Sequence, residues 1–376
     1  MREPVLTEAA LLHTPLHALH LELGARMVPF AGYAMPVQFP AGILAEHRHT
    51  RTQASLFDVS HMGQAQLRGA GAAAALESLV PADVVGLGLG RQRYTFFTND
   101  AGGILDDLMV ANPGERLFLV VNAARKAHDF ALLKQRCDME VLADRALLAL
   151  QGPAAASVMA RLAPDAAALA FLSLAEVAIE GIPCLVSRSG YTGEDGFEIS
   201  VAAGRAEELA RALLAQGEVR PAGLGARDSL RLEAGLCLYG HDIDETTTPV
   251  EAGLGWAIPS VRRRGGARAG GFPGAAVILD QLERGAARKR VGILPEGRAP
   301  LREGTTLEDS AGGIAGTLTS GGFGATLDQP VAMGYVRADC AAPGSVLRAM
   351  VRGKPRACRV TTLPFVPHRY HRGPRP

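Results

Sequence analysis

The chain has 376 residues, of which 48% are hydrophobic and 20% charged, and its 39 Lys and Arg nearly balance its 38 Asp and Glu. This length exceeds one ordinary hydrophobic core, so we expect two or three domains. The composition excludes disordered and fibrous classes, the charge balance argues against a nucleic-acid binder, and the short apolar runs exclude a membrane-embedded protein.

The N-terminal segment MREPVLTEAALLHTPLHALH predicts where the protein resides. It contains Glu3 and Glu8, and it has neither a secretory apolar core with a cleavage site nor an acid-poor, Arg- and Ser-rich transit stretch. We therefore expect a cytosolic, cytoplasmic protein. The cysteines are odd in number and lack CxxC spacing, which argues against a disulfide framework or a zinc site. We expect all of them to behave as small hydrophobic residues. They are Cys137, Cys184, Cys237, Cys340 and Cys358.

The segment YTFFTNDAGGILDDLMVAN predicts a β-hairpin, with a strand from Tyr94, a turn at Asp100 to Gly103 and a second strand through Val110. Because side chains alternate along a strand, Asp106 and Asp107 lie on opposite, otherwise apolar faces. At least one of them is expected to be desolvated, which makes the pair the first candidate for acid or base chemistry. The alternative, in which both are solvated or act as structural hydrogen-bond acceptors at a sheet rim, stays open.

Two buried strands are expected next. Residues 117–121 predict a strand, with Asn122 capping the helix that follows. Residues 147–150 predict another, after which Gln151-Gly152-Pro153 turns the chain into a helix.

The segment CLVSRSGYTGEDGFEIS predicts a strand ending near Arg188, a glycine-rich loop and a second strand on which Glu198 faces away from its apolar neighbours. Such a loop lets the backbone approach a ligand closely, and Tyr191 offers a flat contact surface. The alternative interpretation is a hairpin with a long polar turn.

A helix is expected from Ala226 to Leu238, closed by Gly240. Arg227 and Arg231 lie one turn apart on it and repel each other unless a nearby carboxylate or an anionic ligand compensates. Pairing within the helix is the alternative interpretation for one of these arginines.

The pattern changes after the Gly- and Arg-rich stretch SVRRRGGARAGGFPGAA, which predicts a linker. Mixed strands and helices before it indicate an α+β region, and short β-rich pieces after it indicate a small closed β domain. We place the boundaries at 10–262, 263–280 for the linker, and 281–371. The basic residues Arg262 to Arg264, Arg268 and Arg288 to Arg290 either steer an acidic partner or form a solvated linker.

Several ordered segments together resemble the glycine cleavage T-protein family, from Thr14 to Tyr370. They are TPLHALHLELGARMVPFAGYAMPVQF, SLFDVSHMG, TNDAGGILDDLMV, ALQGP, SGYTGEDGFEIS, ARDSLRLEAGLCLYGHDIDETTTPVEAGLGW, AMGYV and LPFVPHRY. The resemblance implies an α+β fold with a folate-binding region of two interleaved α/β subdomains plus a C-terminal all-β barrel domain, arranged around a central opening.

The resemblance also implies an activity in glycine catabolism. An aminomethyltransferase of this family moves a one-carbon unit from the aminomethyl-lipoyl arm of lipoylated H-protein to tetrahydrofolate, releases ammonia and forms 5,10-methylenetetrahydrofolate. Tetrahydrofolate is then a co-substrate, and we expect no metal, no nucleic-acid partner and no membrane.

Residue roles follow from the same resemblance, position by position. Asp107 matches the family's catalytic aspartate, Glu198 its pterin-binding glutamate and Arg227 its substrate-contacting arginine. Tyr370 matches a family tyrosine near the C-terminus, and the weaker matches among substrate-binding residues are Tyr94, Tyr191 and Met62. The chemistry agrees, because a carboxylate accepts the paired N–H donors of a pterin and an arginine suits the anionic glutamyl tail of folate.

The same scaffold is compatible with two other functions. A folate-dependent demethylase shares the pocket but takes a different methyl donor, and a folate-binding accessory protein of tRNA modification or iron–sulfur maintenance carries a KGCYxGQ-type signature where this chain reads EAGLCLYGHD. The chain departs from the family at GGFGATLDQPVAMGYV, which puts surface contacts of the C-terminal domain in doubt, and the tail HRGPRP is expected to be flexible.

Overall fold

A computed structural model describes residues 11–373 of the chain. Glu3 and Glu8, on which the expectation about location depends, lie outside this range, as do the last three residues of the tail. Within the range, every helix is too short or too polar to cross a membrane.

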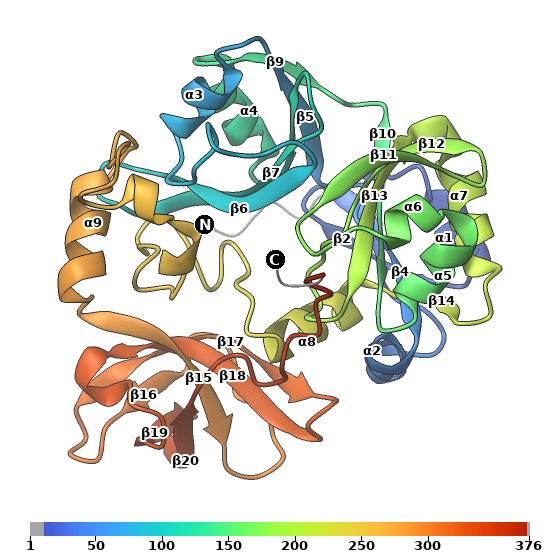
Figure 1. Cartoon of the computed structure of the whole chain (residues 1–376). Helices are drawn as coiled ribbons and strands as arrows, with labels where there is room; N and C mark the ends of the chain where they lie inside the picture. Colours follow the sequence, from blue (N-terminus) through green and yellow to red (C-terminus); the bar gives the residue numbers. More distant parts are fainter. Residues whose placement is uncertain (1–10, 374–376) are drawn as a thin grey trace.

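Figure 1 shows three lobes, two built on open sheets and one on a barrel. The first lobe holds a five-stranded sheet in the order β6-β7-β8-β5-β9, and helices α3 and α4 cover one face of it. The bounds are β5 (Gly63–Arg68), α3 (Ala72–Glu77), β6 (Arg91–Thr98), β7 (Ile104–Asn112), β8 (Leu117–Val121), α4 (Lys126–Lys134) and β9 (Asp138–Val141).

The second lobe holds a six-stranded sheet in the order β11-β12-β13-β10-β4-β14. Its strands are β4 (Ala54–Asp58), β10 (Arg145–Gln151), β11 (Leu174–Ile179), β12 (Ile182–Ser187), β13 (Gly196–Ala202) and β14 (Val219–Pro221). Four helices line a core on one face of it: α1 (His17–Glu22), α5 (Ala155–Leu162), α6 (Pro164–Ala167) and α7 (Ala206–Leu214). A small sheet near the start of the described chain contains β1 (Leu12–His13), β2 (Arg26–Phe30) and β3 (Tyr33–Gln38). Helix α1 lies between β1 and β2, and α2 (Ile43–Thr52) follows β3.

The two lobes are interleaved along the chain. Strand β4 belongs to the six-stranded sheet, residues 63–141 then build the five-stranded sheet, and β10 returns to the six-stranded one beside β4. Every residue of β10 but the first is buried, because it is an inner strand with apolar side chains on both faces. The predicted fold of two interleaved α/β subdomains is confirmed.

The third lobe is a closed antiparallel barrel in the order β15-β18-β17-β16-β19-β20, which confirms the predicted all-β domain. Its strands are β15 (Arg288–Pro295), β16 (Thr306–Glu308), β17 (Ile314–Gly324), β18 (Gln329–Arg337), β19 (Val346–Val351) and β20 (Lys354–Thr361). Helix α8 (Leu224–Glu233) packs against β17 and β18, and α9 (Ala275–Arg284) leads into β15. Short 3-10 turns span Ala203–Arg205, Gly255–Ala257, Ser260–Arg262 and Ala338–Cys340.

The helix expected from Ala226 to Leu238 ends five residues early, at Glu233. Gly235 adopts a left-handed conformation with φ of 66°, which side chains other than glycine rarely accept, and a Cβ there would lie 3.1 Å from that of Leu363. The predicted closure at Gly240 is therefore wrong, and the next residues form turns.

The Gly- and Arg-rich stretch packs against the first lobe. Arg262 is buried and pairs with Glu77 at the end of α3 at 2.8 Å, and Arg268 contacts both Glu77 and Asp83. Arg288 pairs likewise with Glu251 at 2.9 Å. These three arginines pair with carboxylates within the chain, whereas Arg263 is exposed and donates to backbone carbonyls. That the basic residues steer an acidic partner stays a prediction.

The segment after the barrel crosses back to the sheet lobes. The backbone nitrogens of Phe365 and Val366 donate to the carbonyl of Glu233, and that of Arg369 donates to the carbonyl of Gly193. The carbonyl of His371 accepts a hydrogen bond of 2.7 Å from Phe171. His371 is thus anchored, and the prediction of a flexible tail is wrong at that residue.

Candidate functional site

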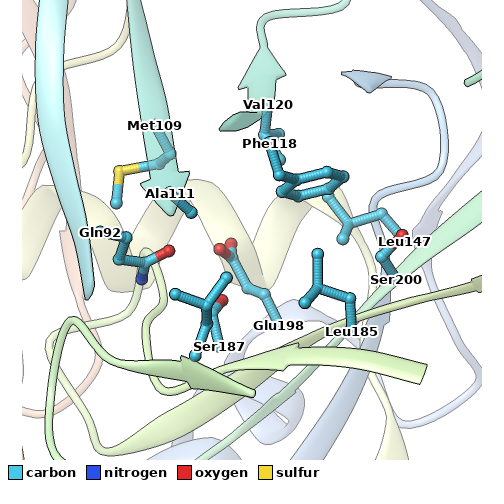
Figure 2. A pocket seen from close by; sticks show the side chains of 11 residues that line it. Gln92, Met109, Ala111, Phe118, Val120, Leu147, Leu185, Ser187, Glu198 and Ser200 are labelled. Carbon is cyan, nitrogen blue, oxygen red and sulfur yellow. The ribbon is translucent and has the colours of Figure 1, made fainter. Parts of the chain in front are cut away.

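The two open sheets face each other across a cleft. Side chains from both sheets belong to one apolar cluster. Strands β7 and β8 contribute Met109, Ala111, Phe118 and Val120, and the facing sheet contributes Leu147 and Leu185. A narrow pocket opens within this cluster, and Figure 2 shows Glu198 projecting into it between the two groups. The remaining lining residues are Gln92, Leu174, Ser187 and Ser200.

Strand β13 sets the direction of Glu198. Phe197, Ile199 and Val201 are fully buried in the core on the helix side, so Glu198 and Ser200 point to the cleft, as the alternation in the sequence predicted. Ser189 donates a hydrogen bond of 2.9 Å to Oε2 of Glu198. Its Oε1 has no hydrogen-bond partner among residues 11–373, so this half-buried carboxylate is available to a ligand.

Asp107 lies on the same face of β7 as Met109 and is half-buried. Asn122 donates a hydrogen bond of 2.7 Å to its Oδ1, and the hydroxyl of Tyr94 on the neighbouring strand β6 donates another. Burial, followed by the electrostatic effect of the neighbouring Asp106, raises the pKa of Asp107 to about 7, and the two hydrogen bonds oppose the shift. A carboxyl group with such a pKa can exchange a proton near neutral pH.

Asp106 lies on the opposite face of β7 and is fully buried. Burial, followed by its contact with Asp129 on α4, raises its pKa to about 8. The predicted separation of the two aspartates is confirmed, because only Asp107 shares the face that lines the cleft.

Asn122 was predicted to cap the following helix, and this is wrong. Helix α4 begins at Lys126 after Arg125, whereas the side chain of Asn122 contacts both aspartates of β7. The sequence contained a signal for the contact between Asn122 and the aspartates. The asparagine directly follows a buried strand, and two carboxylates lie on the adjoining hairpin.

Arg227 and Tyr191 form the neighbouring wall. The Arg227 guanidinium lies 4.6 Å from the centroid of the Tyr191 ring, and the Tyr191 hydroxyl donates to the carbonyl of Cys237. Within the described part of the chain Arg227 has no carboxylate partner, whereas Arg231 pairs with Asp228 and Asp242. Pairing within the helix thus accounts for Arg231 alone, and Arg227 is left for an anion.

The remaining predicted residues take different places. The Tyr94 ring stacks on Trp256 at 5.6 Å, and Trp256 was not among the predicted site residues. Met62 is half-buried and packs against the apolar cluster of the cleft. The Tyr370 ring stacks on Phe171 at 4.0 Å, which fixes it in the C-terminal segment near the loop that carries Tyr191.

No group of three or more His, Cys, Asp or Glu side chains within residues 11–373 is arranged to hold a metal ion. Within residues 11–373, the polar groups available to a ligand in this region include one carboxylate oxygen of Glu198, Nε2 of Gln92 and the guanidinium of Arg227. Such groups suit an organic ligand with N–H donors at one end and negative charge at the other.

Two family models match the chain, one described as the GCVT N-terminal domain over residues 16–261 and one as the glycine cleavage T-protein C-terminal barrel domain over residues 288–367. The chicken protein named "Aminomethyltransferase, mitochondrial" is 48% identical over 96% of this chain and 94% of its own length. The human protein of the same name is 46% identical, over 97% and 92%.

A solved structure agrees with these matches. The glycine cleavage system aminomethyltransferase T from Bartonella henselae superimposes with a TM-score of 0.89 at 44% identity, over 96% of this chain and 99% of that one.

The expectation of a cytoplasmic protein is contradicted by the relatives. The chicken and human proteins are named as mitochondrial, as is the 43% identical protein of Dictyostelium discoideum. The expectation depended on the composition of the first residues alone, which is a weaker indicator of location than similarity along the whole chain.

Proposed function

The chain belongs to the glycine cleavage T-protein family, and from this premise we propose how its cleft performs the family's transfer reaction. It is an aminomethyltransferase of the glycine cleavage system. The substrates we assign are the aminomethyl-lipoyl arm of H-protein and tetrahydrofolate, and the products are ammonia, dihydrolipoyl H-protein and 5,10-methylenetetrahydrofolate.

One observation supports this assignment most directly: Glu198 enters the cleft from one sheet, while Asp107 lies on the facing sheet on the cleft side of β7. Glu198 accepts hydrogen bonds from the adjacent N–H and amino donors of the pterin, through the oxygen that has no partner among residues 11–373. Arg227, unpaired with any carboxylate in the same range, binds the anionic glutamyl tail.

Asp107 acts on the nitrogens that receive the carbon. In the overall transfer the carbon–sulfur and carbon–nitrogen bonds of the aminomethyl arm break, and two carbon–nitrogen bonds to folate form. Two N–H protons of folate leave and end on the sulfur and on ammonia, so the reaction balances without an oxidant. Asp107, with a pKa raised to about 7 chiefly by burial, accepts such a proton and returns it.

The other named residues complete the pocket. Tyr94 holds Asp107 by its hydroxyl, Tyr191 supports the Arg227 guanidinium, and Met62 contributes apolar surface near the pterin. Tyr370 belongs to the segment that crosses the loop of Tyr191, which places it for contact with the substrate.

The domain division that we propose is a folate-binding region at 10–262, a connection at 263–280 and a barrel domain at 281–371. The connection contains the first part of α9 and contacts the first lobe through Arg268. A demethylase on the same scaffold is not favoured, because the curated relatives named above are all aminomethyltransferases.

The assignment is tested with purified protein, aminomethylated H-protein and tetrahydrofolate, omitting each component in turn. We expect methylenetetrahydrofolate and ammonia in equal amounts only in the complete mixture. Formation of either product at the same rate without H-protein, or transfer from an N-methyl or S-methyl donor instead, contradicts the assignment.

A further inference from the structure

A second pair of buried carboxyl groups lies behind the cleft, on the face of β7 that is turned away from it. Asp106 and Asp129 are both fully buried, and their side chains contact each other between β7 and α4. Oδ1 of Asp129 lies 3.0 Å from Nδ1 of the exposed His128, whereas its buried Oδ2 has no hydrogen-bond partner in the described chain.

Two carboxylates in a dry contact cannot both keep their charge, because neither has solvent to screen the repulsion. A single proton between them removes the repulsion and supplies the missing donor for Oδ2 of Asp129. Burial and Asp129 raise the pKa of Asp106 to about 8, and burial raises that of Asp129 to about 6. At neutral pH the proton therefore resides on Asp106.

Asn122 connects this pair to the cleft. Its Nδ2 donates to Oδ1 of Asp106 at 3.0 Å and to Oδ1 of Asp107 at 2.7 Å, and its backbone nitrogen donates to Oδ2 of Asp106 at 3.3 Å. An amide held at both ends has little freedom, so the position of Asp106 determines where Asn122 can hold the carboxyl group of Asp107.

We propose that Asp106 is a positioning residue that carries a proton shared with Asp129, and that this neutral pair holds Asp107 in place for catalysis through the side chain of Asn122. The proposal deepens the function proposed above and rests on it for the role of Asp107. A neutral Asp106 also spares Asp107 the repulsion of an adjacent negative charge, so Asp107 can still ionise and accept a proton.

Other titratable and charged groups also lie around these carboxyl groups. His128 and Arg125 face Asp129, Tyr239 faces Asp106 and, from β6, Tyr94 faces Asp107. Tyr191 and Cys237 approach Asp107 from the second lobe, and burial raises the pKa of both, which keeps them protonated at neutral pH.

The test compares Asp106→Asn, Asp106→Ala and, as a matched control, Asp100→Asn in the exposed turn of the same hairpin. The asparagine amide resembles a neutral acid, because its NH2 group donates to Asp129 and its oxygen accepts from the Asn122 side chain, while only the 3.3 Å hydrogen bond from the Asn122 backbone nitrogen is lost. We expect Asp106→Asn to retain kcat within about threefold, and Asp106→Ala to lose about tenfold or more in kcat with little change in the KM for folate. Asp100→Asn should match the wild type.

The pH profile separates positioning from a purely structural role. With a protonated Asp106, the acid limb of kcat/KM is the same in Asp106→Asn as in the wild type. With an ionised Asp106, removing its charge lowers the pKa of Asp107 and moves the limb down by about one pH unit. The proposal would be overturned if the acid limb of Asp106→Asn moved down in this way, or if Asp106→Ala kept the wild-type kcat.

A measurement without substrate distinguishes failure of this proposal from failure of the proposed function. Infrared difference spectra of the wild type and Asp106→Asn at pH 7 should show the loss of a C=O band of a protonated carboxyl group. A spectrum without that band overturns the shared proton, even if the transfer reaction proceeds. A wild type that has the band but makes no methylenetetrahydrofolate contradicts the function alone.

Discussion

The Nδ2 atom of Asn122 lies 2.7 Å from Oδ1 of Asp107, so an asparagine after β8 donates a hydrogen bond to the proposed catalytic carboxyl group. This contact orients Asp107 on the cleft side of β7 while Asp106 is retained on the other side. The replacements below examine what each of these groups contributes.

Replacing Asp107 with Asn should abolish most of the turnover and leave folding and folate binding nearly intact. The amide has the shape of the carboxyl group but cannot accept a proton, and a positioned acid or base contributes about 10²- to 10⁴-fold. The measurement is kcat with saturating H-protein, together with folate affinity by calorimetry. Asp106→Asn should be much milder, and the reverse order would contradict the assignment of faces on β7.

The pH dependence of kcat/KM should follow the ionisation of Asp107. Its pKa is raised to about 7, first by burial, so the carboxyl group is protonated and inactive as a base below that value. Activity is therefore expected to rise through about pH 7 and to level off above it. Initial rates in a buffer series of constant ionic strength give kcat/KM as a function of pH. An acid limb with a midpoint near the ordinary pKa of aspartate would contradict the role of Asp107 as the base.

Glu198→Gln should weaken tetrahydrofolate binding by about 10- to 100-fold, because a hydrogen bond to a charged group contributes about 1.5–3 kcal/mol. The substitution preserves the shape of the side chain but replaces one acceptor oxygen by a donor facing the pterin donors. Fluorescence titration measures the Kd. Glu180→Gln, in the exposed turn between β11 and β12, is the control and should bind folate as the wild type does. Equal affinities in the two variants would exclude Glu198 from the pterin site.

Arg51→Met should destabilise the fold. Arg51 is buried and reaches Glu194 at 2.9 Å and Glu233 at 3.1 Å, and both carboxylates are buried as well. Removing one partner leaves uncompensated buried charge, which typically costs about 3–5 kcal/mol. Urea unfolding followed by circular dichroism reports the loss.

The matched control for Arg51 is Arg205→Met, which removes one side of the exposed pair between Arg205 and Glu208. Its urea midpoint should stay close to that of the wild type, since an exposed pair is well screened by water. Similar midpoints for the two variants would show that the buried cluster does not stabilise the fold.

Tetrahydrofolate should raise the melting temperature without any added metal or nucleotide. A ligand at about 100 times its Kd stabilises the folded state by about 2.7 kcal/mol. Differential scanning fluorimetry with folate, with EDTA, with divalent metals and with ATP provides the comparison. An increase with a metal or nucleotide, and none with folate, is the outcome that would contradict the proposed ligand.

Local patterns in the sequence determined much of the architecture. Alternation of apolar residues predicted β7 and β13 and the opposite faces of Asp106 and Asp107, because the period of two is a property of the strand itself. Spacing on α8 predicted that one of its two arginines pairs within the helix, since neighbours three residues apart meet on a helix surface.

Tertiary contacts decided what those patterns left open. Asn122 serves the aspartates instead of a helix because the folded hairpin brings two acceptors to it, and Arg262 and Arg268 of the Gly-rich stretch are held against the first lobe because Glu77 and Asp83 meet them there. Pairings of this kind join residues 15 to about 190 positions apart, so no local pattern contains them. The sequence by itself determined the strands and the candidate residues, and only the packing of the two sheets determined that Glu198 meets the face of β7 that carries Met109 and Asp107.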